Sequence, residues 1–73
     1  MPEGWIKVST HTDELSAQLE KQLLEENGIV SVLINKQDSS FHFGKVEVYV
    51  QNEQLEAAQG IVSSGNINPV DED

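Results

Sequence analysis

The sequence predicts an α+β fold in which two helices cover one face of a small antiparallel sheet. Apolar and polar residues alternate over residues 5–10 and 45–50, and residues 29–35 are rich in β-branched side chains, as is typical of strands. Helical periodicity runs through residues 11–28 and 52–65. The order is therefore β-α-β-β-α, and a right-handed crossover places the third strand between the first two. This topology is a ferredoxin-like plait.

The first strand and the first helix follow directly from the amino terminus. The alternation in residues 5–10 places Ile6 and Val8 on one face of the strand. The residues on its other face are Trp5, Lys7 and Ser9. Thr12 is the expected N-cap of the helix, and Thr10 followed by Asp13 is the alternative. The helix ends at Asn27-Gly28, where glycine suits the left-handed conformation.

The apolar stripe of this first helix contains one acidic residue. The side chains that form the stripe are Ser16, Ala17, Leu19, Leu23 and Leu24. Glu20 projects inside the same arc. We expect Glu20 at the rim, with its methylene groups packed and its carboxylate in water. A buried functional carboxylate is the alternative, although no partner lies near it in the sequence.

In the other two predicted strands, the alternation of residues indicates the inward face clearly for one strand and less clearly for the other. Val46, Val48 and Val50 are expected to face the helices. The outward residues of that strand are Lys45, Glu47 and Tyr49. In residues 29–35, one face carries Val30, Val32 and Ile34, and the other carries Ile29, Ser31, Leu33 and Asn35.

The second helix completes the domain. Asn52 is its expected N-cap. Its apolar residues are Leu55, Ala58, Ile61 and Val62. Residues 1–65 are expected to form a single domain and residues 66–73 a short acidic tail. Residues 66–70 are a candidate edge strand, because Pro69 cannot donate a ladder hydrogen bond.

Composition restricts the classes of partner. The 73 residues include 13 acidic residues, four lysines, no arginine and no cysteine, which gives a net charge of −9. Such a charge repels phosphate backbones and anionic lipids, so nucleic acid and membranes are not expected as partners. No apolar run is long enough for a membrane span and the first residues do not resemble a signal peptide, so we expect a cytoplasmic protein. A domain this small buries little surface, which favours a homo-oligomer.

Three segments carry a family resemblance: WIKVST, KQLLEENGI and LINKQDSS…FGKVEVYV. With their spacing, they resemble a bacterial family described as putative prokaryotic signal-transducing proteins, over roughly residues 5–63. The resemblance implies a ferredoxin-like fold grouped with the nitrogen-regulatory PII proteins, and it implies no catalytic residues. PII proteins contact their targets through a loop between the second and third strands. They also bind ATP with basic side chains that this arginine-free chain lacks, so no cofactor is expected.

The loop at the equivalent position is the first candidate binding site. Its residues are Lys36, Gln37, Asp38, Ser39, Ser40, Phe41, His42 and Phe43. The two phenylalanines either fold back as a lid over the end of the sheet or anchor a partner. Ser39 or Ser40 with His42 does not predict catalysis, because neither an oxyanion hole nor an orienting carboxylate accompanies them. His11 and His42 have no second ligand at helical spacing, so no metal site is expected.

The face of the sheet away from the helices is the second candidate. Its expected residues are Trp5, Lys7, Ile29, Leu33, Glu47 and Tyr49. These side chains either pair across strands to stabilise the sheet or form an interface in a homo-oligomer or with a partner. We therefore predict a non-enzymatic regulatory module that acts by protein contacts through residues 36–43 and this face. A small-ligand sensor with a cleft between protomers, and a purely structural oligomerisation unit, are the alternatives.

Overall fold

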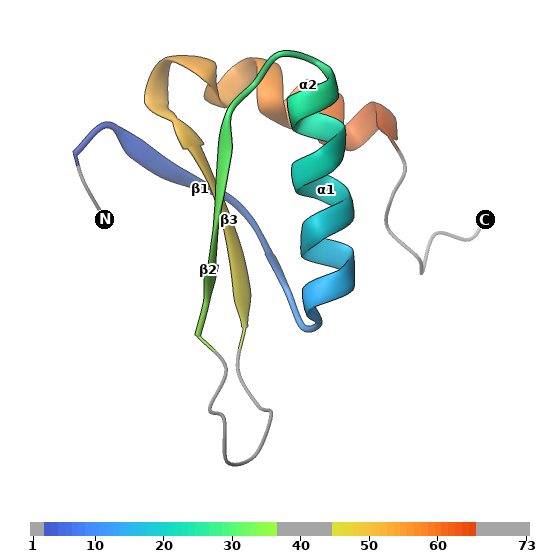
Figure 1. Ribbon diagram of the computed structural model, residues 1–73. Helices are drawn as coiled ribbons and strands as arrows, with labels where there is room; N and C mark the ends of the chain where they lie inside the picture. The colour runs from blue at the N-terminus through green and yellow to red at the C-terminus, as the bar shows by residue number, and fades with distance from the viewer. Residues whose placement is uncertain (1–2, 37–44, 66–73) are drawn as a thin grey trace.

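The computed structural model describes residues 3–36 and 45–65 (Figure 1). Its elements are β1 (Trp5–His11), α1 (Glu14–Glu26), β2 (Ser31–Asn35), β3 (Val46–Gln51), the 3₁₀ helix η1 (Asn52–Gln54) and α2 (Leu55–Gly65). The three strands form an antiparallel sheet in the order β1-β3-β2. The predicted α+β fold and the predicted central place of the third strand are confirmed, and the order is that of a ferredoxin-like plait. Residues 66–70, the candidate edge strand, lie outside the described residues.

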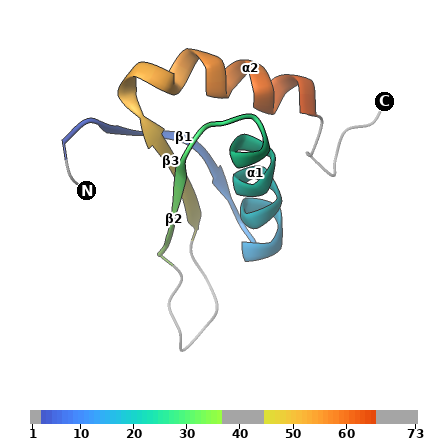
Figure 2. The same ribbon diagram turned by 45° about the horizontal axis from the view of Figure 1, so that its top comes forward.

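Both helices lie on one side of the sheet, with α2 crossing near one end of α1 (Figures 1 and 2). The core forms where the helices meet β3, whose Val46, Val48 and Val50 are fully buried. The remaining members of the buried cluster are Ala17, Leu24, Ile29 and Ala58. The alternation predicted for β3 is therefore confirmed, and the opposite face of the sheet is left uncovered by the described part of the chain.

The strand β1 contains an irregularity that the sequence pattern did not predict. Lys7 pairs with Tyr49 and Ser9 pairs with Val48, so Val8 is an extra residue in the ladder. Such a bulge shifts the alternation by one residue, because two residues then oppose one on the partner strand. Ser9 therefore lies on the helix-covered face with Val48, and its predicted place beside Trp5 and Lys7 is wrong.

The faces of β2 are also settled by the register. Ser31, Leu33 and Asn35 pair with the inward valines of β3, so they share the helix-covered face. Ile29 is only 4% exposed and belongs to the core. The prediction that Ile29 and Leu33 lie on the open face is therefore wrong. Val32 and Ile34, which pair with Tyr49 and Glu47, lie there instead.

The ends of α1 are fixed by local hydrogen bonds. Asp13, rather than the predicted Thr12, is the N-cap, and its carboxylate accepts from the Ser16 N–H at 2.8 Å. That hydrogen bond lowers the pKa of Asp13. At the other end Gly28 has φ +83°, as predicted, and its N–H donates to the Glu25 carbonyl. The Ile29 N–H donates to the Leu24 carbonyl, which completes a Schellman motif and sends the chain into β2.

The second helix begins later than predicted. Asn52 opens the short η1 turn, whose cap lacks a side-chain hydrogen bond, and α2 follows from Leu55. The Asn52 N–H instead donates to the Gly4 carbonyl at 2.6 Å, which ties this turn to the start of β1. The predicted apolar residues of α2 do face the core. Gly65 lies so close to α1 that a Cβ there would overlap the Leu23 side chain.

Candidate functional site

The uncovered side of the sheet, which we call the open face, is built by the alternating residues of all three strands. β1 contributes Trp5, Lys7 and Thr10; β2 and the residue after it contribute Val32, Ile34 and Lys36; β3 and the residue before it contribute Lys45, Glu47, Tyr49 and Gln51. The Lys36 N–H donates to the Lys45 carbonyl at 2.8 Å, which extends the β2–β3 ladder beyond Asn35.

Glu47 is the polar centre of this face. Its Oε1 accepts from the Tyr49 hydroxyl at 3.0 Å and lies 3.5 Å from Lys36 Nζ. Its Oε2 lies 3.5 Å from Lys7 Nζ, so all three strands converge on one carboxylate. The Tyr49 hydrogen bond, followed by the charges of Lys36 and Lys7, holds the pKa of Glu47 below its ordinary value. Glu47 therefore positions two lysines and a tyrosine on the open face.

The rest of the open face is apolar and aromatic. Trp5, Val32, Ile34 and Tyr49 are each partly exposed. Antiparallel sheets with one wet face normally carry polar side chains there. Aromatic side chains such as Trp5 and Tyr49 are enriched in protein–protein interfaces, where charged residues are confined to the polar rim. By composition the open face therefore resembles a protein-binding surface.

A second polar cluster, Ser9, His11 and Glu20, lies on the other side of the sheet between β1 and α1. Glu20 is 1% exposed, so the prediction that it lies at the rim is wrong. Its Oε2 accepts from the Ser9 hydroxyl, and its Oε1 lies 2.6 Å from His11 Nε2. The bulge at Val8 places Ser9 and His11 on the helix-covered face, which gives Glu20 the two partners that the sequence pattern did not indicate.

This cluster contains the residue types of a catalytic triad but not its geometry. In a triad, histidine uses one ring nitrogen for the nucleophile and the other for the carboxylate. Here His11 Nε2 faces both Glu20 and the Ser9 hydroxyl, which lies 3.3 Å away, and Ser9 itself donates to the carboxylate. Ser9 is thus not activated by a base. The arrangement gives a buried carboxylate two hydrogen-bond partners and joins α1 to β1.

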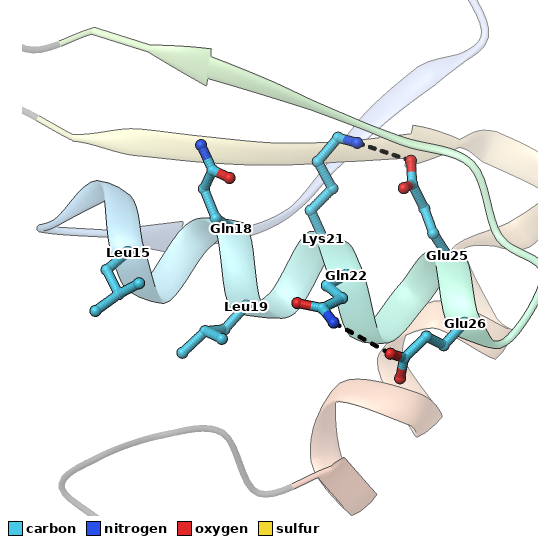
Figure 3. Close-up of a pocket in the computed structure, with 7 residues that line it drawn as sticks. All are labelled: Leu15, Gln18, Leu19, Lys21, Gln22, Glu25 and Glu26. Atoms are coloured by element: carbon cyan, nitrogen blue, oxygen red, sulfur yellow. Dashed lines mark hydrogen bonds and ion pairs between the residues drawn. The ribbon is translucent and has the colours of Figure 1, made fainter.

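The side of α1 turned away from the strands carries a surface hollow of about 550 Å³ (Figure 3). The residues that project directly outward are Leu15, Leu19, Gln22 and Glu26, which we call the outer ridge. Gln22 donates to Glu26 along the ridge, and Lys21 pairs with Glu25 at its side, nearer β2. Because a single helix supplies the whole lining, the hollow lies open and cannot enclose a small molecule.

The predicted site residues are only partly placed by these observations. Lys36 is described and contacts Glu47, whereas residues 37–43 of the candidate loop lie outside the described residues. Of the six residues predicted for the open face, four lie together there: Trp5, Lys7, Glu47 and Tyr49. Within the described ranges, no three histidine or carboxylate side chains gather to hold a metal ion. In the same ranges, no helix is both long and apolar enough to cross a bilayer.

Comparison with known proteins gives one match. A family model described as "Putative prokaryotic signal transducing protein" matches residues 5–66. The matched region includes every described helix and strand. No curated protein and no solved structure matches the chain significantly.

Proposed function

The chain belongs to this family of putative prokaryotic signal transducing proteins, and we propose that it is a small, non-enzymatic binding module of the cytoplasm. It relays a signal by protein contacts through the open face and through residues 36–43. The family description supports the signalling class of role. The observation that carries the choice of surface is the composition of the open face, where Trp5, Val32 and Ile34 are partly exposed around a fixed polar centre.

The polar centre favours specific recognition over nonspecific hydrophobic association. Lys7 and Lys36 stand on either side of Glu47, with side chains 48% and 59% exposed. They are held near the apolar side chains and remain accessible to a partner's carboxylates. Positioning charged groups in advance reduces the entropy lost on binding. The apolar residues would supply the desolvated centre of the interface, and the lysines would supply orientation at its rim.

A photo-cross-linking amino acid placed on the open face tests this proposal in the native host. A cross-linker at Ile34 should capture a specific partner, and one at Gln59 on the exposed side of α2 should not. Adding Val32→Asp should remove the capture at Ile34, because it places a charge in the apolar centre. Glu56→Lys, on the exposed side of α2, is the control and should leave the capture unchanged. Equal capture from Ile34 and Gln59 would refute the open face as the binding surface.

The loop requires its own test, since the proposal includes residues 36–43. Replacing Phe41 and Phe43 by alanine should weaken capture at Ile34 if these rings anchor the same partner. Unchanged capture with an unchanged urea midpoint would restrict the proposal to the open face alone. A lower urea midpoint with unchanged capture would instead favour the lid interpretation of the loop.

A further inference from the structure

We propose that a second copy of this chain is an occupant of the open face, bound through the outer ridge of its α1. Each copy would present the open face to one neighbour and the outer ridge to another, so association would be head to tail. This inference rests on the proposed function in one respect, namely that the open face binds protein. It adds the identity of the partner surface and the geometry of the assembly.

The outer ridge exposes apolar area that the fold does not use. Leu15 is 69% exposed and Leu19 is 47% exposed, although the sequence pattern predicted that Leu19 would be buried. They stand one turn apart and project from the side of α1 opposite the strands (Figure 3). A single exposed leucine on a surface needs no explanation, but two adjacent ones on one helix side form an apolar patch. Gln22 and Glu26 continue the same line with polar groups.

Charge is strongly segregated between the two sides of the molecule. Three of the four lysines, Lys7, Lys36 and Lys45, lie on the open face, where Glu47 is the only carboxylate among the described strand residues. The cap of α1, the two helices and η1 carry six exposed carboxylates against the single lysine Lys21: Asp13, Glu14, Glu25, Glu26, Glu53 and Glu56. The net charge of −9 is thus unevenly distributed: the open face is cationic and the helix layer is acidic.

The two surfaces are complementary in both respects. The apolar centre of the open face, with Val32 and Ile34, matches the leucine pair of the outer ridge. The lysines at one end of the open face, Lys36 and Lys45, match the carboxylates at one end of α1. Two open faces placed against each other would instead bring cations together, which disfavours a symmetric sheet-to-sheet dimer. At physiological salt the Debye length is about 8 Å, so these local charges outweigh the distant ones on each copy.

Contact between two different surfaces has a geometric consequence. A heterologous contact does not close on itself in a dimer, so it produces either a ring or an open chain of copies. Each free end would still display one open face or one outer ridge. A host protein that binds the open face would therefore compete with the next copy and limit the assembly.

Two charge variants separate the surfaces. Leu15→Lys with Leu19→Lys places cations on the outer ridge, where lysine is a good helix former and the side chains are exposed. Lys36→Glu with Lys45→Glu reverses the charge at the end of the open face and leaves Lys7 and Tyr49 on Glu47. The matched control for the first variant is Glu56→Lys, which raises the net charge by the same two units on the exposed side of α2. Circular dichroism and urea midpoints confirm that each variant is folded.

Sedimentation at micromolar to millimolar concentrations tests the inference on the purified chain. The wild type and the control should exceed about 16 kDa, twice the 8.1 kDa of one chain, and each variant alone should remain a monomer. An equimolar mixture of the two variants should form a dimer and nothing larger, because it contains one intact open face and one intact outer ridge.

Several results would overturn the inference. These are a wild type that is monomeric throughout, a dimer that the outer-ridge variant retains, or a mixture of folded variants that stays monomeric. None of these outcomes concerns host partners. Capture from Ile34 in the host, alongside a monomeric wild type, would leave the proposed function intact while this inference fails.

Discussion

Removing His11 should destabilise the domain more than removing Glu20, its partner in the cluster beneath the sheet. The Glu20 side chain is 1% exposed, whereas the His11 side chain is 18% exposed. His11→Ala leaves the Oε1 atom of a wholly buried carboxylate without a donor. Glu20→Leu leaves an imidazole that still reaches water at the edge of the sheet. The asymmetry in burial therefore predicts an asymmetry in cost.

The magnitudes follow from the same geometry. Removing the partner of a buried carboxylate costs about 3–5 kcal/mol when the carboxylate is left uncompensated, and we expect the lower value, because Ser9 still donates to Oε2 of Glu20. Glu20→Leu removes the carboxylate that accepts from the Ser9 hydroxyl, and His11 Nε2, 3.3 Å from that hydroxyl, remains as its partner. The lost hydrogen bond costs about 1 kcal/mol, which about 2 kcal/mol of new apolar burial offsets. The net cost of Glu20→Leu is therefore no more than about 1 kcal/mol. Once Glu20 is leucine, His11→Ala should cost only about 1 kcal/mol, so the coupling between the two residues is about 2 kcal/mol.

Urea unfolding followed by the fluorescence of Trp5, the only tryptophan, measures all four members of this double-mutant cycle. With a slope of about 1 kcal/mol per molar urea, His11→Ala should lower the midpoint by about 3 M. The free energy of unfolding of a domain of this length is about 4–11 kcal/mol, so the loss caused by His11→Ala is a large fraction of it. Glu56→Leu, which replaces an exposed glutamate of α2, is the control and should change stability by less than about 0.5 kcal/mol. Equal costs for the two single variants, or additive costs in the double variant, would refute this account.

Three further predictions concern the turn after α1, the core side of β2 and the open face. Gly28→Ala should cost about 1 kcal/mol in urea unfolding, because φ is +83°, and Gly28→Asn should cost less; equal costs would contradict the left-handed cap. Ser31→Ala should raise stability by up to about 1 kcal/mol, since the buried hydroxyl has no hydrogen-bond partner in the described structure; a loss would show that it has one. Tyr49→Phe should lower the urea midpoint at pH 7. The reason is that a carboxyl group whose pKa in the folded protein lies below its ordinary value of 4.5 stabilises the fold at pH values above 4.5. That difference should disappear as the pH falls through the lowered pKa of Glu47, and a difference that persists at pH 2 would contradict it.

Local sequence patterns predicted which segments form helices and strands. They also assigned the buried and outward faces of one strand, β3. The alternation of β3 identified its buried valines, because a central strand with one face on the core has a strict period of two. Asn27-Gly28 identified the end of α1, because few residues other than glycine adopt the conformation that the Schellman motif requires. In these places the local conformation and the tertiary fold require the same residue types.

The tertiary structure decided which face of an element meets the core where the sequence patterns left this open. In residues 29–35 both faces carry β-branched or apolar residues, so alternation alone could not say which face meets the helices. The Schellman motif settles it, since Ile29 packs beside Leu24 before β2 begins, and every second residue then follows it inward. Leu19 and Glu20 exchanged their expected places for a related reason. The sheet covers the side of α1 that carries Glu20, and Leu19 falls outside that side.

The bulge at Val8 connects the buried cluster with the open face. Ile6, Ser9 and His11 of β1 pair with the inward valines of β3, and Val8 also packs against the core. A strand without a bulge cannot turn both Ile6 and Ser9 inward, because they are three residues apart. If the strand were regular and Ile6 stayed inward, Ser9 and His11 would leave Glu20 without its partners. If Ser9 stayed inward, Ile6 would be exposed and Lys7 would be buried beneath the sheet. The extra residue lets both ends of β1 turn the required side chains inward. The contacts of buried Glu20 with β1 and the position of Lys7 beside Glu47 therefore depend on the same bulge.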